Sequence, residues 1–281
     1  MTSVYKHGNL EEIRKDMDAR YKAGGGDAYA ATLPWDVMRH HWLHSELEGL
    51  VKECLRDYST HLPLRITDLG CGTKSSFEKP SFQDALRRFE VEATLVDLSE
   101  EAIRHLQARS EEAMHRAWGP KATFSFRSSP AEELAKVASG QHMVISVESI
   151  EHWSDVEDGL RGVHDALLPG GYFVLTTPNR DSLHVRMARK LGFEAPFCAN
   201  DHTYEFGYEE LDRILDGQGF DKVAESGVGL APYWALENVI GGRLRHITDN
   251  DPEVLEWLQS MGRRCPEFSF CQVKAFQRRK S

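Results

Sequence analysis

The sequence predicts an α/β fold: a doubly wound, seven-stranded sheet, mostly parallel with an antiparallel edge, plus an N-terminal helical region. Between residues 64 and 179, five apolar runs alternate with helical patterns. This alternation requires parallel strands joined by right-handed crossovers. Two further strand-like segments, 221–230 and 267–278, follow a helix and are expected to pair antiparallel at one edge.

The elements follow in a regular order. Helical spacing at 10–21 and 34–58 flanks a glycine-rich stretch, and we expect residues 1–60 to form a lid. Residues 61–281 are expected to form one domain with substrate-side insertions near 180–206 and 227–262. Its expected strands are 64–72, 92–99, 122–129, 142–149 and 172–179, and its expected helices are 81–89, 100–118, 131–138, 156–170, 207–220, 235–247 and 252–264.

Composition excludes several classes of protein. Hydrophobic residues make up 41% and charged residues 28%, which is globular, and no apolar run is long enough to span a membrane. An odd number of cysteines, five, with no CxxC pair and no apolar leader favours a cytoplasmic protein with free thiols. The net charge of −10 disfavours nucleic acid and favours a small-molecule partner, while the oligomeric state is left open.

A glycine turn follows the first strand in "ITDLGCGTKSS" (66–76). Asp68, Gly70 and Gly72 form D-x-G-x-G, which lets the backbone turn sharply and approach a ligand. Asp97 ends the second strand, 25 positions after Gly72, where a carboxylate could bind two ribose hydroxyls. The third glycine of dinucleotide-binding loops is absent. The pattern therefore favours an adenosine cofactor without a pyrophosphate.

The ordered segments D-x-G-x-G, "LVDLS", "SSPAEEL", "VESIEHW" and "LLPGGYFVLTTPN" resemble the class I S-adenosylmethionine-dependent methyltransferases, which have a Rossmann-like sheet. The resemblance covers residues 60 to about 225. It implies an enzyme that uses S-adenosyl-L-methionine.

The resemblance also implies cofactor-binding roles for particular residues. Those residues are Gly70, Cys71 and Gly72 at the methionine part, Asp68 supporting the loop, Asp97 at the ribose, Leu98, Pro130, Ala131 and Glu132 around the adenine, and Val147 and Glu148 on the inner side.

The segment "VESIEHW" (147–153) places two carboxylates and an imidazole at the end of the fourth strand. Its E-x-x-E-H pattern resembles ubiquinone-pathway O-methyltransferases and small-RNA 3′-terminal 2′-O-methyltransferases. That resemblance implies a divalent metal held by Glu148, Glu151, His152 and His202. A metal could lower the pKa of an acceptor hydroxyl and orient it. Carboxylates favour magnesium, whereas imidazoles favour manganese and its heavier neighbours.

Two other interpretations of this segment stay open. His152, together with Glu151, could act as a metal-free base or line the pocket. Alternatively, Glu151 could cap the next helix.

The leading hypothesis for the function is methyl transfer to a small molecule, at a hydroxyl oxygen and with or without a metal. The alternatives are an RNA 3′-terminal 2′-O-methyltransferase, an N- or C-methyltransferase of specialised metabolism, and a non-catalytic binding module.

Overall fold

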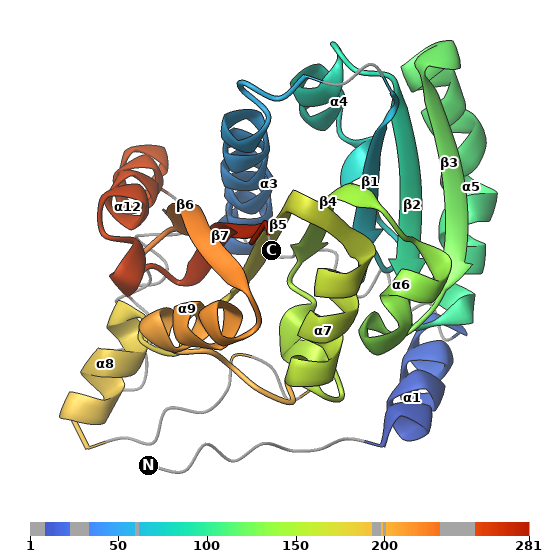
Figure 1. The fold of residues 1–281 in the computed structure, drawn as a ribbon. Coiled ribbons are helices and arrows are strands. Elements are labelled where there is room, and N and C mark those ends of the chain that lie inside the picture. Colours follow the sequence, from blue (N-terminus) through green and yellow to red (C-terminus); the bar gives the residue numbers. More distant parts are fainter. Residues whose placement is uncertain are drawn as a thin grey trace.

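The computed structural model describes residues 9–22, 34–59, 62–192, 198, 201–230 and 251–280. These residues build a sheet of seven strands with helices on both faces (Figure 1). The strands are β1 Leu64–Leu69, β2 Val91–Asp97, β3 Ala122–Ser128, β4 Gln141–Val147, β5 Leu167–Pro178, β6 Phe220–Val228 and β7 Cys271–Arg278.

The strand order is β3-β2-β1-β4-β5-β7-β6. Strands β1 to β5 pair in parallel, and β7 is antiparallel to both β5 and β6. The predicted fold class is therefore confirmed, including the antiparallel edge. The chain order reverses between β1 and β4. In open α/β sheets, ligands bind at the carboxyl ends of the strands beside such a reversal.

Two helical layers bury the two faces of the sheet (Figure 1). On α3, Leu43, Leu47 and Val51 recur every fourth residue, are fully buried and pack on the sheet. One layer contains α3 Pro34–Cys54, α4 Pro80–Leu86, α5 Glu100–Trp118 and α12 Pro252–Arg264, and the other contains α6 Leu134–Val137, α7 Val156–Ala166 and α9 Tyr208–Gly217.

The structure differs from the predicted elements most clearly in two places. The expected helix 156–170 ends at Ala166, because Leu167 already pairs with Gln141 as the start of β5. The predicted lid, residues 1–60, also divides in two. Helix α3 belongs to the core layer, whereas α1 (Leu10–Lys22) has no buried residue and contacts α5. The predicted helix 235–247 and most of the glycine-rich stretch lie outside the described residues.

Helix α8 (Leu183–Lys190) lies within the predicted insertion 180–206. Its buried face carries His184 and Val185, and the His184 ring stacks on Phe270 with the ring centroids 5.2 Å apart. Among the described residues, no helix is both long and apolar enough to cross a membrane.

Candidate active site

The glycine loop after β1 is held by Asp68. This carboxylate is 2% exposed, and its Oδ2 accepts hydrogen bonds from Ser75 Oγ at 2.6 Å and from the Ser76 N–H at 3.0 Å. Burial raises the pKa of Asp68 to about 6. Asp68 therefore ties the glycine loop to the end of β1.

Gly70 and Gly72 both have positive φ angles, 74° and 55°. A Cβ on Gly70 would lie 1.9 Å from Ser149 Oγ, so this position has no room for a side chain. The N–H groups of Gly70 and Cys71 both donate to Val96 O, at 2.7 and 3.1 Å. The loop is thus fastened to β2 and packed against the segment that follows β4.

Asp97 ends β2 inside the same loop system. Its Oδ2 accepts a hydrogen bond from the Gly72 N–H at 2.8 Å, and its Oδ1 accepts one from the Ser99 N–H at 2.9 Å. The side chain is 2% exposed, and burial raises its pKa to about 6. The carboxylate therefore joins the β1 loop to the start of α5.

The other predicted cofactor residues occupy the strand ends beside this loop. Leu98 and Val147 are half-buried, and Pro130 and Ala131 are buried. The side chain of Glu132 has partners within the protein. Its Oε1 accepts a hydrogen bond from the hydroxyl of Ser154 and, at 3.4 Å, from the Asp155 N–H, so it is tied to the start of α7.

Helix α1 covers the glycine loop, and no motif in the sequence pointed to these contacts. Asp18 accepts hydrogen bonds from the Ser99 hydroxyl and, at 3.3 Å, from the Glu101 N–H. The Tyr21 hydroxyl lies 3.1 Å from the point that a Cβ on Gly72 would occupy. These partners are more than 50 positions away along the chain, so local spacing carries no signal for them.

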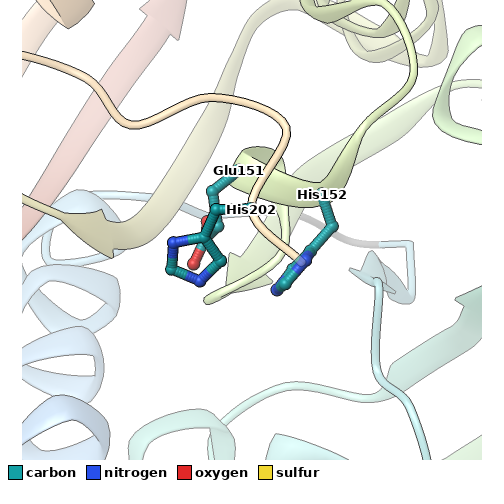
Figure 2. Close-up of side chains that lie close together, drawn as sticks. All are labelled: Glu151, His152 and His202. Carbon is teal, nitrogen blue, oxygen red and sulfur yellow. The ribbon is translucent and has the colours of Figure 1, made fainter. Parts of the chain in front are cut away.

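Glu151, His152 and His202 come together beyond β4. Each offers one possible metal-ligand atom, and these atoms lie within 4.8 Å of one another. Figure 2 shows the three side chains extending to the same side of the turn that carries Glu151 and His152. The two imidazole centroids are 4.9 Å apart. Thr203, next to His202, donates its N–H to Glu151 O at 2.8 Å and so fixes the two segments together.

Hydrogen bonds fix the tautomers of both histidines. His152 Nδ1 lies 3.2 Å from Asp201 O, and His202 Nδ1 lies 2.6 Å from Glu205 Oε1. A carbonyl oxygen can only accept, so Nδ1 of His152 carries a proton. The Glu205 oxygen also accepts from the Cys198 N–H. In the neutral rings, Nε2 therefore keeps its lone pair for a metal or a proton.

Burial sets the electrostatics of this cluster. The carboxyl of Glu151 is 1% exposed, and burial and the nearby Glu148 raise its pKa well above the ordinary value. Thr177 Oγ1 donates to Glu151 Oε2 at 2.9 Å. Burial and the neighbouring His202 lower the pKa of His152. His152 is thus neutral near pH 7, as both a metal ligand and a general base require.

Glu148 lies outside the group formed by the other three predicted metal ligands. Its Oε2 is 2.5 Å from a guanidinium nitrogen of Arg39, a residue of α3 that no motif singled out. The structure thus brings together three of the four predicted ligands and pairs the fourth with an arginine. Arg39 is separated from Glu148 by 109 positions, so only the packing of α3 on the sheet reveals the pair.

Two aromatic residues at the end of the predicted insertion 180–206 lie in the core. Tyr204 and Phe206 are 6% and 0% exposed and pack in the layer that contains α7 and α9.

Comparison with known proteins agrees with this geometry. A family model described as a methyltransferase domain matches residues 39–225. The ubiquinone biosynthesis O-methyltransferase of Ruegeria pomeroyi is 27% identical over 194 residues, 65% of this chain and 73% of that protein. The enzyme of the same name from Cereibacter sphaeroides is 26% identical over 202 residues, 68% of this chain and 76% of that protein.

Solved structures show the same fold at low sequence identity. The magnesium protoporphyrin IX methyltransferase of Synechocystis, solved with bound S-adenosylhomocysteine, has a TM-score of 0.57 at 14% identity, covering 96% of this chain and 100% of that chain. A putative methyltransferase in complex with the Haloferax volcanii activator Trm112 has a TM-score of 0.54, also at 14% identity, covering 96% and 98%. The matched family model, which covers more than half of the chain, together with the glycine loop and the sheet order, shows that the chain belongs to the methyltransferase domain family as a class I S-adenosylmethionine-dependent methyltransferase.

Proposed function

We propose that this enzyme transfers the methyl group of S-adenosylmethionine to a hydroxyl oxygen of a small-molecule acceptor, with the help of a divalent metal ion held by Glu151, His152 and His202. The observation that supports a metal ion is the cluster itself: one buried carboxylate and two imidazoles with ligand atoms within 4.8 Å of one another, beside the predicted cofactor loop. A cluster placed only to solvate a turn would not need two ring nitrogens fixed with their lone pairs available.

The residues around the glycine loop fit the cofactor. Asp97 has two buried carboxylate oxygens beside Gly72, suited to the paired hydroxyls of a ribose. Glu148 Oε1 is buried and accepts no hydrogen bond, which suits a cationic ligand at the end of β4. S-adenosylmethionine is such a cation, and its sulfonium supplies an activated methyl group. The protein's task is then to hold an acceptor oxygen in line with that methyl group and to exclude water.

The donor set also fits a divalent ion. The Asp201 carbonyl and the Glu205 carboxylate accept hydrogen bonds from Nδ1 of His152 and His202, an arrangement typical of metal-binding histidines. Two imidazoles and one carboxylate favour manganese, iron or cobalt over magnesium. Such an ion, when bound, lowers the pKa of an acceptor hydroxyl. Glu151, His152 and His202 would orient the ion. Because the pKa of Glu151 is raised, its carboxyl would be protonated at low pH and the ion would bind more weakly there.

The acceptor class rests on two supports. The relatives are named as O-methyltransferases of ubiquinone biosynthesis, which favours an oxygen of a small molecule. The net charge of −10 opposes the long-range attraction that an RNA phosphate backbone needs. As the methyl acceptor, we therefore favour a small molecule that presents two neighbouring oxygens over the 3′-end of an RNA.

The test is a methylation assay with 3,4-dihydroxybenzoate as a model acceptor. We expect methyl transfer from S-adenosylmethionine to an oxygen, loss of activity with a chelator, and recovery that is stronger with Mn²⁺ than with Mg²⁺. His202→Gln should remove the metal dependence and lower the rate by about ten- to a hundredfold, the scale of losing the support of a metal site. His105→Gln is the matched control, because this histidine lies on the exposed side of α5.

Other outcomes would point elsewhere. If the chelator and His202→Gln both leave methyl transfer unchanged, the metal proposal is wrong. His152 would then act as a metal-free base. Transfer to the 3′-end of a short single-stranded RNA, without transfer to the dihydroxybenzoate, would favour the RNA alternative.

A further inference from the structure

Arg39 and Glu148 form an ion pair inside the candidate site. The guanidinium nitrogen lies 2.5 Å from Glu148 Oε2, and the two side chains are only 16% and 22% exposed. Arg39 is held from the other side as well. Its guanidinium carbon lies 5.8 Å from the centre of the Phe270 ring, and its nitrogen lies 3.9 Å from Cys271 Sγ. The arginine therefore has a fixed position between α3 and β7.

The backbone of Glu148 is fixed too. Glu148 has a φ of 50°, and no other non-glycine residue of the described part of the chain has a positive φ. Its N–H donates to both the backbone oxygen and the hydroxyl of Thr176, each at 3.1 Å. Such a left-handed residue persists only where its surroundings enforce it. Here the strained backbone and the arginine together determine where the carboxylate lies.

We infer that Arg39 holds Glu148 away from the proposed metal ion and towards the cofactor. The metal site then has three protein ligands. This inference rests on the metal site proposed above. One oxygen of Glu148 is bound by Arg39, and the other is buried without a hydrogen bond, as the proposed contact with a cationic cofactor requires. Only Glu151, His152 and His202 then hold the ion.

A three-ligand site has a chemical consequence. Catalytic metal sites keep coordination positions free of protein, whereas structural sites fill them. With Glu148 withheld, the ion would keep positions for two neighbouring oxygens of the acceptor. The charge also matters: an arginine that neutralises one carboxylate lowers the affinity of the site for cations. Arg39 thereby acts as a positioning residue rather than a catalytic one.

The experiment measures Mn²⁺ binding at pH 8 by calorimetry, and the number of Mn²⁺-bound waters by proton relaxation. The proteins are the wild type, Arg39→Met, Glu148→Gln and the double variant. We expect Glu148→Gln to change Mn²⁺ affinity by less than about threefold, and Arg39→Met to raise it by about tenfold, since a carboxylate is freed and a cation removed. Arg39→Met should also lose one bound water. The double variant should return to the wild-type water number.

Two results would overturn the inference. If Glu148→Gln and Arg39→Met both weaken Mn²⁺ binding at least about tenfold, Glu148 is a ligand that Arg39 orients. If the wild type binds no Mn²⁺, the proposed metal site itself fails, which is a different result from a lost ligand. Arg39→Lys keeps the cation and should keep the wild-type affinity and water number. If Arg39→Met does not fold, Arg39→Lys and Glu148→Gln still test the inference.

Discussion

At the scale of single residues, Asp68 and Asp97 are two buried carboxyl groups at neighbouring strand ends. Burial raises the pKa of each to about 6, because the charged form loses its hydration. Ribose hydroxyls donate hydrogen bonds to a carboxylate, so the proposed cofactor contact requires Asp97 to be ionised. Cofactor binding should therefore weaken as the pH falls through about 6 and Asp97 takes up a proton.

We predict that the Kd for S-adenosylhomocysteine is constant above about pH 7 and rises by about tenfold per pH unit below pH 6. The sign follows from the raised pKa: the free protein takes up a proton as the pH falls through 6, and binding must release it. Calorimetry from pH 5 to 8 measures this slope. Asp97→Asn, which cannot titrate, should weaken binding at pH 7.5 and flatten the slope. An unchanged slope would assign the titration to another group, Asp68 first.

Gly70 is a residue whose identity is required by packing. A Cβ there would lie 1.9 Å from Ser149 Oγ, on a backbone with a φ of 74°. We predict that Gly70→Ala lowers the free energy of unfolding by roughly 2–4 kcal/mol, from left-handed strain plus overpacking. Urea denaturation measures the change.

Gly217, at the end of α9, is the matched control for Gly70. A Cβ at Gly217 would have no atom within 4 Å. Gly217→Ala should leave the unfolding free energy unchanged or raise it by less than about 1 kcal/mol. Equal losses in both variants would show that the Ser149 contact does not decide the cost.

At the scale of elements, α1 bridges the two halves of the site. Asp18 binds the Ser99 hydroxyl beside Asp97, and Arg20 pairs with Asp201 at 2.7 Å, next to His152. No residue of the helix is fully buried, but Ile13, Met17 and Tyr21 recur on one face and are half-buried, so this face and the polar contacts together hold the helix in place. We propose that α1 is the part of the predicted lid that closes over the cofactor.

The lid predicts a kinetic effect. Arg20→Ala should speed the dissociation of S-adenosylhomocysteine by about two- to fivefold, the value of one partly exposed ion pair, with a smaller change in association. Stopped-flow fluorescence measures both rates. Lys15→Ala, which removes an exposed ion pair with Glu11 on the same helix, should change neither rate. Equal rates in the Arg20 variant and the wild type would leave α1 without a role in cofactor retention.

Helix α3 has two roles as an element. Its face with Leu43, Leu47 and Val51 packs on the sheet, and an earlier turn brings Arg39 to the carboxyl end of β4. Since one rigid helix serves both purposes, the packing of its core face sets the position of the arginine in the site.

At the scale of the whole molecule, the carboxyl ends of β1, β2 and β4 meet at one edge of the sheet. The glycine loop follows β1, Asp97 ends β2, and Glu151 and His152 follow β4, so the parallel topology brings them to one edge. His202 reaches the same edge from the segment after α8. The two helical layers bury both faces of the sheet and leave this edge for ligands. The net charge of −10 disfavours the binding of polyanions.

The sequence alone determined the fold class and the family. Alternating apolar runs specify parallel strands, and motifs such as D-x-G-x-G or E-x-x-E-H lie within a few residues, so local spacing reports them. The roles of the individual cofactor residues stay predictions. Only the tertiary structure decided how the site is divided: Arg39 withdraws Glu148 from the other candidate ligands, and Asp18 reaches the start of α5. Those contacts join residues more than 80 positions apart. They depend on how helices pack on the sheet, and no periodicity along the chain records that.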